Sequence, residues 1–406
     1  MTVSVSQAGT KIDDASRFRW LVLAVFVLST SINYLDRATL SALAPVLVKE
    51  FHLSNTQFGL IGSAFSLTYA ASAPFAGLLI DRMGLNRAIS FAVGMWSCAG
   101  IATGLTRGLT GLVGCRAVLG IAEAAGIPAA GKAIHQYLRP GERALGNAVN
   151  QAGVSLGSVI APVLATWIAS RGGWRNAFVV TGALGFAWIP LWLWVSRRAP
   201  AAPLPAQHRA ADAAMLRDRR LWVFAAANAL SMVGYFFWFL WTSKYMVDTY
   251  RLTLRQAVWF VWIPPVFACC GGFLGGWLSL RLVERGVPAA AARFRVCLAA
   301  AIVSLITAAL PWVTSPAWAT AGISASIFAV AAFSVNMYTL PLDTFGAAAA
   351  GFTVSILVSS YGAISTILGP ALGAVIDAHG YAPVTAAIAF TPLAACALLW
   401  YTRSTQ

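Results

Sequence analysis

The chain has 406 residues, of which 59% are hydrophobic and 10% are charged, and its mean hydropathy is +0.73. A soluble globular protein carries about 25% charged residues, so this composition excludes that class. A net charge of +15 would suit a nucleic-acid-binding protein, but the basic residues lie mainly in short loops between apolar stretches, where a membrane protein places them.

Apolar stretches of about 20 residues, the length that a helix needs to cross a hydrocarbon core, recur along the whole chain. They predict an all-α membrane protein with twelve transmembrane helices. In chain order the predicted spans are 18–46, 57–80, 88–106, 109–137, 142–169, 174–196, 221–247, 256–281, 293–313, 316–340, 345–376 and 381–402.

One long polar stretch, 197–220, separates the sixth span from the seventh. Its Pro- and Ala-rich start and its basic end predict a cytoplasmic linker. The sequence therefore predicts two six-helix bundles, residues 1–196 and 221–406.

The positive charges are distributed unevenly between the two sides of this topology. With the N-terminus placed in the cytoplasm, eighteen Lys and Arg residues fall on the cytoplasmic side and seven on the other. Because cytoplasmic loops of membrane proteins are enriched in Lys and Arg, we expect both termini in the cytoplasm. The expected location is the inner membrane of a bacterium, in direct contact with the lipid bilayer.

The two halves of the sequence resemble each other. A Gly-rich start and a central Pro are shared by GVSLGSVIAPVLATWIASRGGW (153–174) and GAISTILGPALGAVIDAHGY (362–381). A second, weaker similarity relates GLLIDRMG (77–84) to GGWLSLRL (275–282), in which the acid is missing. Many secondary transporters are built from duplicated six-helix halves around a site at the membrane midplane. The repeat predicts pseudo-symmetric bundles of this kind.

Few charged residues lie deep inside the predicted spans. The acids are Asp36 and Glu123, and the basic residues are Arg37, Arg116 and Lys132. A charge at the bilayer centre costs about 2.5–3.5 kcal/mol, so these positions indicate a function. A static network of ion pairs between helices is the alternative, and Lys132, close to a span end, is expected to be structural.

The spacing of these residues indicates which of them share a helix face. Tyr34 and Arg37 do, as do Arg116 and Glu123, although the latter two lie about 10 Å apart along the axis and are too distant to pair. An Arg guanidinium binds a carboxylate through two parallel hydrogen bonds, and a carboxyl group in a membrane can carry a proton near neutral pH. Together they predict transport of a small organic anion with protons.

Three motifs resemble those of the major facilitator superfamily, specifically its anion:cation symporter family. GLLIDRMGLNR (77–87) resembles the loop signature G-x-L-x-D-R-x-G-R. NYLDRATLSALAP resembles the first-helix pattern Y-x-D-R-x-N-L-S-x-A, and CRAVLGIAEAAGIPAAGK resembles the fourth-helix pattern R-x-x-x-G-x-x-E-A-x-x-x-P. The segment 116–195 is similar to hexuronate transporters in particular. The resemblance implies the superfamily's twelve-helix fold and a monomer.

The resemblance also implies substrate-binding residues in the first half. Arg37 matches the arginine that holds the substrate carboxylate, and Tyr34 and Tyr69 match tyrosines of the pocket. Asn150 and Gln151 fall near a polar position of the pocket. The second half offers five pocket candidates: Tyr235, Trp238, Asn336, Tyr338 and Tyr361. Tyr235 and Trp238, three residues apart and beside Gly234, are preferred because sugar rings often stack on aromatic side chains.

A second group of matching residues concerns coupling and conformational change. Asp36 and Glu123 match two protonation sites, and Arg116 matches the arginine coupled to them. Asp81 and Arg82, in the loop signature, are expected to latch the outward-facing state. The chain departs from the family where Ser243 and Lys244 stand in a seventh-helix pattern that usually reads W-x-P-x-Y.

The predicted function is import of a hexuronate or related sugar acid by proton-coupled alternating access. Symport of another carboxylate, such as galactonate, tartrate or a short monocarboxylate, remains an alternative, and a proton-coupled exporter or a transporter-like receptor is a more distant one. The sequence carries no nucleophile elbow, phosphate loop or metal-ligand cluster, so we expect neither an enzyme nor a metal or cofactor site. The six cysteines lie within apolar stretches and are expected to be small core residues.

Overall fold

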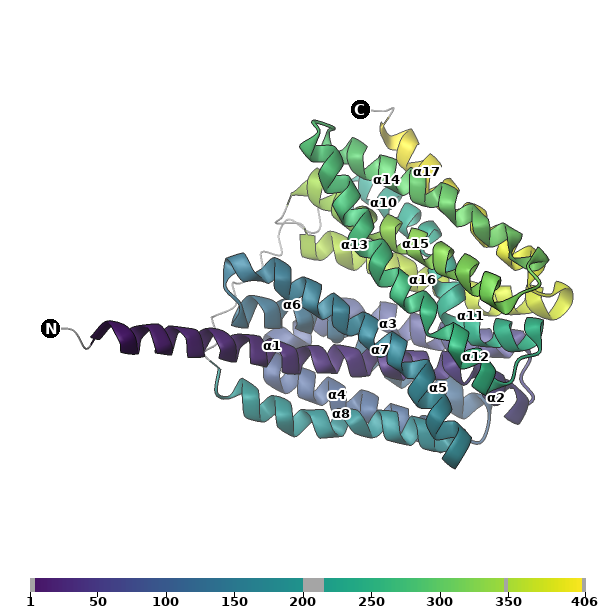
Figure 1. Ribbon diagram of the computed structural model, residues 1–406, viewed down its shortest axis with the longest axis horizontal. Coiled ribbons are helices and arrows are strands. Elements are labelled where there is room, and N and C mark those ends of the chain that lie inside the picture. Colours follow the sequence, from purple (N-terminus) through teal and green to yellow (C-terminus); the bar gives the residue numbers. More distant parts are fainter. Residues whose placement is uncertain (1–3, 200–214, 347–349, 404–406) are drawn as a thin grey trace.

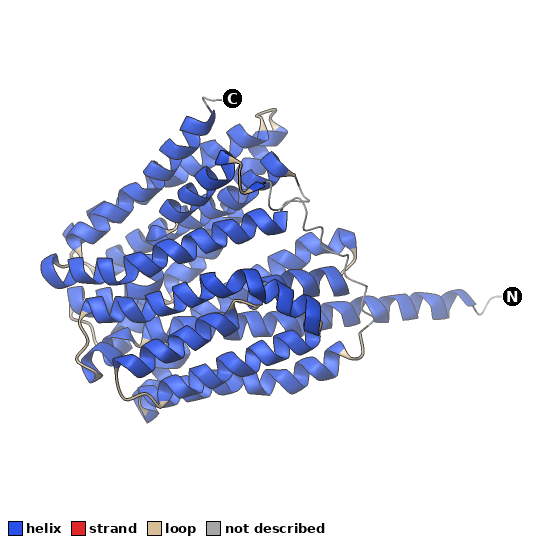
Figure 2. Cartoon of the chain, turned by 180° about the vertical axis from the view of Figure 1, so that it is seen from behind, coloured by secondary structure: helices blue, strands red, loops and turns tan. Residues whose placement is uncertain are grey.

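The computed structural model describes residues 4–199, 215–346 and 350–403, and its regular elements there are all helices (Figures 1 and 2). The first half contains α1 (Ser4–Ala42), α2 (Ala44–Glu50), α3 (Asn55–Met83), α4 (Leu85–Gly104), α5 (Leu109–Glu123), α6 (Gly126–Tyr137), α7 (Arg143–Gly172) and α8 (Trp174–Ser196). The second half contains α10 (Arg219–Ser231), α11 (Val233–Tyr250), α12 (Leu254–Val261), α13 (Ile263–Glu284), α14 (Ala289–Ser304), α15 (Pro316–Phe345), α16 (Ala350–His379) and α17 (Ala382–Arg403). Of the predicted linker 197–220, residues 200–214 lie outside the described part.

The predicted membrane spans all correspond to helices. Within the described residues, eleven helical stretches are long and apolar enough to cross a membrane. The remaining span is α4, whose Asn86, Arg87 and many small residues lower its hydropathy, and which packs against α5 and α8. The twelve-helix fold class is therefore confirmed, with breaks inside several spans, such as the one at Leu43 just before Pro45.

Local sequence determines where the key helices begin. The Ser54 hydroxyl accepts a hydrogen bond from the backbone N–H of Gln57 at 3.1 Å, and the Gln57 side chain accepts one from Ser54 N–H at 3.0 Å. This reciprocal cap fixes the start of α3. Gly84 has φ +77°, a conformation that favours glycine, and it makes the tight turn from α3 to α4.

The two halves pack together at one end of the molecule and separate toward the other (Figure 1). A hydrophobic cluster at the first end, which we call the closed end, draws on both halves and includes Leu43, Trp174, Trp241, Tyr245 and Ile376. Toward the other end, the open end, two further large clusters have buried residues from one half each. The C-terminal end of α8, which leads into the linker, lies at the open end (Figure 1).

The closest contact between the halves is the packing of α3 against α16. A Cβ atom added at Gly59 would lie 2.0 Å from the Gly369 carbonyl oxygen, and one at Gly373 would lie 2.3 Å from that of Asn55. At the end of this α3/α16 seam, the Asp377 carboxylate accepts hydrogen bonds from the backbone N–H groups of Asn55 and Thr56, both at 2.9 Å. An acid from one half thus caps a helix N-terminus of the other, where the helix dipole favours negative charge.

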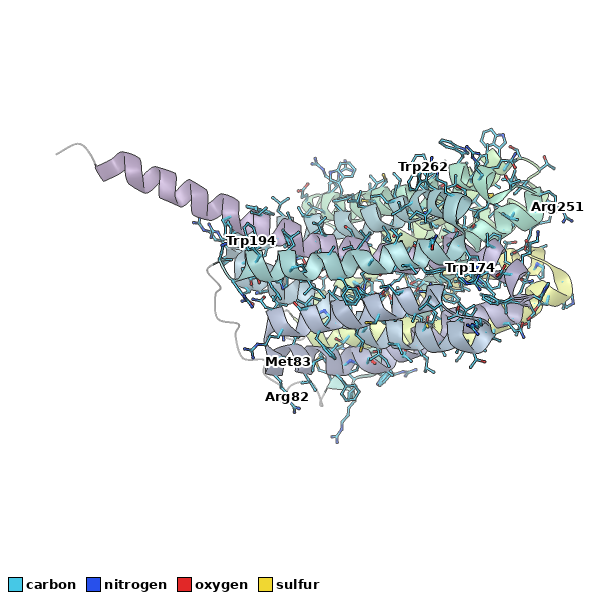
Figure 3. The ribbon with its side chains drawn as sticks, turned by 90° about the horizontal axis from the view of Figure 1, so that it is seen from below. Arg82, Met83, Trp174, Trp194, Arg251 and Trp262 are labelled. Atoms are coloured by element: carbon cyan, nitrogen blue, oxygen red, sulfur yellow. The ribbon has the colours of Figure 1, made fainter. Side chains whose placement is uncertain are left out.

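A second contact joins α1 to α11 at the closed end. The Ser41 hydroxyl donates to the Leu240 carbonyl oxygen at 3.0 Å, and Ser243 donates to the Ala42 carbonyl oxygen at 2.9 Å. Aromatic side chains and charges mark the two ends of the molecule: Trp194 and Arg82 lie toward one, Trp174 and Arg251 toward the other (Figure 3).

Candidate functional site

A cavity of about 780 Å³ lies between the two halves. Its walls come from α1, α3, α4, α5, α6 and α7 of the first half and from α11, α12, α13, α15 and α16 of the second. The two halves contribute different chemistry: the first supplies the charged and amide side chains, and the second supplies mostly aromatic and aliphatic ones.

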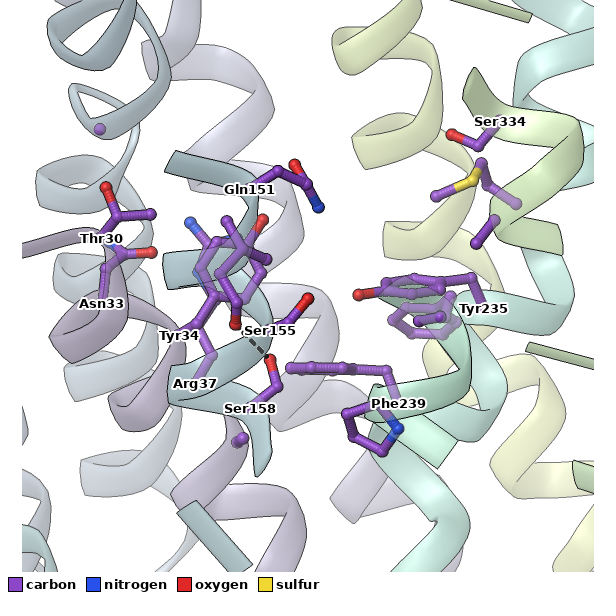
Figure 4. A pocket seen from close by; sticks show the side chains of 18 of the residues that line it. Thr30, Asn33, Tyr34, Arg37, Gln151, Ser155, Ser158, Tyr235, Phe239 and Ser334 are labelled. Atoms are coloured by element: carbon purple, nitrogen blue, oxygen red, sulfur yellow. Dashed lines mark hydrogen bonds between the residues drawn. The ribbon is translucent and has the colours of Figure 1, made fainter. Parts of the chain in front are cut away.

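One face of α1 forms much of the polar wall. Thr30, Asn33, Tyr34 and Arg37 follow one another at intervals of three, one and three residues, which places them on a single helix face, and all four line the cavity (Figure 4). The expectation that Tyr34 and Arg37 share a face is met, with the guanidinium carbon 5.0 Å from the Tyr34 ring centre.

Arg37 is held by aromatic rings and by one carboxylate. Its guanidinium carbon lies 4.7 Å from the ring centre of Phe65 and 4.8 Å from that of Tyr69. Its Nε donates a hydrogen bond to Glu123 Oε2, across from α1 to α5. The Arg37 side chain keeps 16% of its surface exposed, whereas Glu123 is fully buried. The guanidinium is therefore fixed in position and still accessible from the cavity.

Arg116 and Asp36 complete a buried cluster of four charges with Arg37 and Glu123. Arg116 interacts electrostatically with Glu123, Asp36 and Arg37. Arg116 is 3% exposed and Asp36 is 4% exposed, and among the described residues neither the Asp36 carboxylate oxygens nor the Arg116 Nε has a hydrogen-bond partner. Arg116 and Glu123 line the cavity, but Asp36 does not: it lies behind the wall, on the side of α1 turned into its own bundle. Two arginines and two acids, all ionised, sum to zero charge.

The α7 helix forms the other polar wall. Asn150 and Gln151 both line the cavity, as expected, and Asn150 Oδ1 accepts a hydrogen bond from the Thr30 hydroxyl at 2.9 Å. Ser155 and Ser158 continue the Gln151 face at four and seven residues (Figure 4). These serines, Thr30 and Asn33 were not among the predicted residues, although the same helical spacing from Arg37 and Gln151 would have found them.

The second half supplies an aromatic wall. Tyr235 stacks on Phe239 with ring centres 5.9 Å apart, and both line the cavity (Figure 4). Trp238 also lines it but is only 1% exposed, with its ring packed edge-on against Tyr245. Tyr338 and Tyr361 line the cavity as well.

Asn336 does not belong to this wall. Its amide donates to the carbonyl oxygens of Gly275 at 3.1 Å and Ala332 at 2.9 Å, and the side chain is fully buried between α13 and α15. The structure gives Asn336 a packing role outside the cavity lining, although the sequence placed it among the pocket candidates.

Asp81 and Arg82 lie away from the cavity, near the open end. Asp81 forms an ion pair with Lys132 of α6, and the Lys132 ammonium also lies 3.4 Å from the Gly77 carbonyl oxygen. Lys132 is thus tied to the loop signature rather than to the cavity. In the described residues no group of three or more His, Cys, Asp or Glu side chains is placed to hold a metal ion.

The arrangement suits reversible binding of an anion. An arginine that is accessible, oriented by aromatic rings and paired with a buried acid can exchange that acid for an incoming carboxylate without losing its charge partner. The amide and hydroxyl groups of α1 and α7 around it can hydrogen-bond to polar groups on the rest of the ligand.

Comparisons with known proteins agree with this arrangement. The family model of the Major Facilitator Superfamily matches residues 26–370. The hexuronate transporter of Escherichia coli (strain K12) is 29% identical over 404 residues, covering 94% of this chain and 93% of that protein. The galacturonate transporter of Dickeya chrysanthemi is 30% identical over 283 residues, 64% of this chain and 81% of that protein.

A solved structure shows the same fold. It is that of a bacterial homologue of the human lysosomal transporter Spinster, in an inward-facing and occupied conformation, with a TM-score of 0.79 and 21% identity over 96% of this chain and 97% of that one. The match to the family model covers most of the chain and the helices enclose a central charged cavity, so this multi-pass membrane protein is a transporter that belongs to the Major Facilitator Superfamily.

Proposed function

We propose that this protein imports a hexuronate or a related sugar acid together with protons, by alternating access. The observation that carries the proposal is Arg37, accessible in a cavity between two bundles and paired with the buried Glu123. The similarity to proteins named hexuronate and galacturonate transporters supports a sugar acid as the substrate.

The balance of charges around Arg37 supports proton coupling. When Asp36, Arg37, Arg116 and Glu123 are all ionised, a bound carboxylate leaves one negative charge in excess in a poorly solvated region. Such a charge is costly unless it is neutralised. Glu123 loses its partner when the substrate takes Arg37, and a proton on Glu123 or on Asp36 restores neutrality. One anion is then moved with at least one proton, which also offsets the cost of moving an anion into a negative-inside cell.

The orientation follows from the distribution of basic loops. If both termini and the linker are cytoplasmic, as the excess of Lys and Arg predicts, the open end faces the cytoplasm and the structure represents an inward-facing state. We propose that the protein lies in a bacterial inner membrane as a monomer, and that residues 1–196 and 221–406 rock as two bodies about the cavity.

The first test is uptake of labelled galacturonate and glucuronate into proteoliposomes, with and without an inward proton gradient. We expect gradient-driven uptake by the wild type. In Asp36→Asn and Glu123→Gln we expect gradient-driven uptake to fall at least about 10-fold while substrate exchange persists, because exchange needs no net proton movement. Glu284→Gln, at an exposed Arg281 pair, is the control and should behave as wild type.

Other outcomes would point elsewhere. No uptake and no competition by either sugar acid would remove the hexuronate assignment and leave galactonate, tartrate or short monocarboxylates. Accumulation only when the proton gradient runs opposite to the substrate would indicate an exporter.

We further propose that Asp81 and Arg82 latch the outward-facing state. In the present conformation Asp81 forms an ion pair with Lys132, which belongs to the same bundle. Asp81→Asn should lose transport, by about 10-fold or more, and retain substrate binding, because it changes the balance between conformations and not the cavity. Uptake and equilibrium binding measured on the same preparation provide the test. Wild-type uptake by this variant would contradict the latch.

A further inference from the structure

Five tyrosine side chains gather in the cavity around Arg37. Two belong to the first half and three to the second. They are Tyr34, Tyr69, Tyr235, Tyr338 and Tyr361, from α1, α3, α11, α15 and α16. Because these tyrosines come from both halves, a ligand bound to Arg37 lies between phenol groups of the two bundles, which move relative to each other in the proposed transport cycle.

The three tyrosines of the second half lie close enough to interact with those of the first. Tyr235 lies near Tyr34, Tyr361 and Arg37. Tyr361 lies near Tyr34, Tyr338 and Arg37, and Tyr338 lies near Tyr34. In the close-up view the Tyr235 hydroxyl projects from the second half across the cavity, toward the wall that carries Tyr34 (Figure 4).

The rest of this wall offers little to a polar ligand. Among the described residues of the second half that line the cavity, none carries a charge or an amide side chain. Tyr235 lines the cavity, and its ring is held by stacking on Phe239. Phenol hydroxyls can both donate and accept, and together with the hydroxyls of Ser334 and Thr242 they are the groups by which this half can recognise a hydroxylated ligand.

We infer that Tyr235, Tyr338 and Tyr361 select for hydroxyl groups on the substrate and make closure of the cavity depend on them. This inference rests on the proposed binding of a carboxylate by Arg37. A carboxylate without hydroxyls contacts charged groups of the first half alone. Since a ligand shifts a conformational equilibrium only by its differential affinity for the two states, such a ligand gains little from closure. A sugar acid, whose hydroxyls reach the phenols as the halves approach, favours closure and is transported.

The experiment compares two carboxylates with six-membered rings. Galacturonate carries ring hydroxyls, and cyclohexanecarboxylate carries none. For wild type we expect exchange of galacturonate, and binding of cyclohexanecarboxylate as an inhibitor that is not itself transported. For each of Tyr235→Phe, Tyr338→Phe and Tyr361→Phe we expect galacturonate affinity and exchange to fall about 5- to 20-fold, the loss of one hydrogen bond. The affinity for cyclohexanecarboxylate should stay within about 2-fold of wild type, because a Phe ring keeps the packing.

Tyr245→Phe serves as the matched control. Tyr245 is a buried tyrosine of the same half whose hydroxyl lies 3.4 Å from the Leu310 carbonyl oxygen, outside the cavity lining. This variant should transport galacturonate as wild type does. If it loses as much as the three cavity variants, the effect is structural and the inference is overturned.

Two further outcomes separate this inference from the proposed function. If wild type binds cyclohexanecarboxylate as tightly as galacturonate, glucuronate and galactonate, or if the three Phe variants weaken both kinds of ligand equally, the selection for hydroxyls is wrong while Arg37 retains its role. If wild type binds none of these carboxylates, both the proposed function and the inference fail.

Discussion

Replacing Arg37 with Ala is expected to weaken binding of the transported anion about 30- to 4,000-fold. The guanidinium is the charged group of the cavity that is both accessible and oriented, with aromatic rings on several sides and Glu123 as its partner. Truncating one partner of a desolvated, hydrogen-bonded charge pair costs about 2–5 kcal/mol or more. Equilibrium binding of labelled galacturonate to purified protein measures the loss.

Two companion variants show the cause of that loss. Arg37→Lys keeps the charge but not the planar fork, so we expect a smaller defect, of about 10- to 100-fold. Arg37→Ala also leaves Glu123 buried and unpaired, which destabilises the fold; combining it with Glu123→Gln should restore the melting temperature without restoring binding. Arg175→Ala, at an exposed ion pair with Glu50, is the control. Unchanged affinity in Arg37→Ala would exclude the carboxylate site as described.

Gly373→Leu is expected to open the closed end and to abolish transport. A Cβ atom at this position would lie 2.3 Å from the Asn55 carbonyl oxygen and 2.6 Å from Thr56 N, both backbone atoms of α3. Neither can move without separating α3 from α16, which also breaks the hydrogen bonds of Asp377 to Asn55 and Thr56. Overpacking of this kind costs about 1–3 kcal/mol, enough to shift the conformational equilibrium about 5- to 150-fold.

Spin-label distances measure this shift. Labels at Lys49 on α2 and Arg255 on α12, both exposed and in opposite halves at the closed end, should move to longer separations in Gly373→Leu, in a background without the native cysteines. Gly114→Leu, on α5 with open space around its Cβ position, is the matched control and should leave the distances unchanged. Equal distances in Gly373→Leu and wild type would show that the α3/α16 seam does not hold the closed end.

Asp377 contributes to the same seam through charge. Its carboxylate also accepts a hydrogen bond from the Thr56 hydroxyl at 2.7 Å, so three donors of the first half converge on one acid of the second. The seam therefore combines close backbone packing, which tolerates no side chain, with a cap that is made only when the halves meet.

The sequence by itself determined the membrane spans and the unusual charges. Hydropathy and helix length are local properties, and each predicted span coincides with a helix or a pair of helices in the structure, although α1 begins at Ser4, well before the predicted start at 18. The helical period likewise placed Tyr34 and Arg37 on one face, because 3.6 residues per turn apply to any α-helix. The charges of Asp36, Arg116 and Glu123 stood out because acids and arginines are rare at such depth.

Only the tertiary structure decided how these residues meet. Arg37 pairs with Glu123, 86 positions away in sequence, while its neighbour Asp36 turns behind the cavity wall. Those choices depend on the rotation and depth of α1 relative to α5, which no local pattern encodes. The second-half wall of tyrosines is drawn from three separate helices, and one end is closed by contacts between the two halves. Both features depend on how helices far apart in the sequence pack together, and not on the period of any single helix.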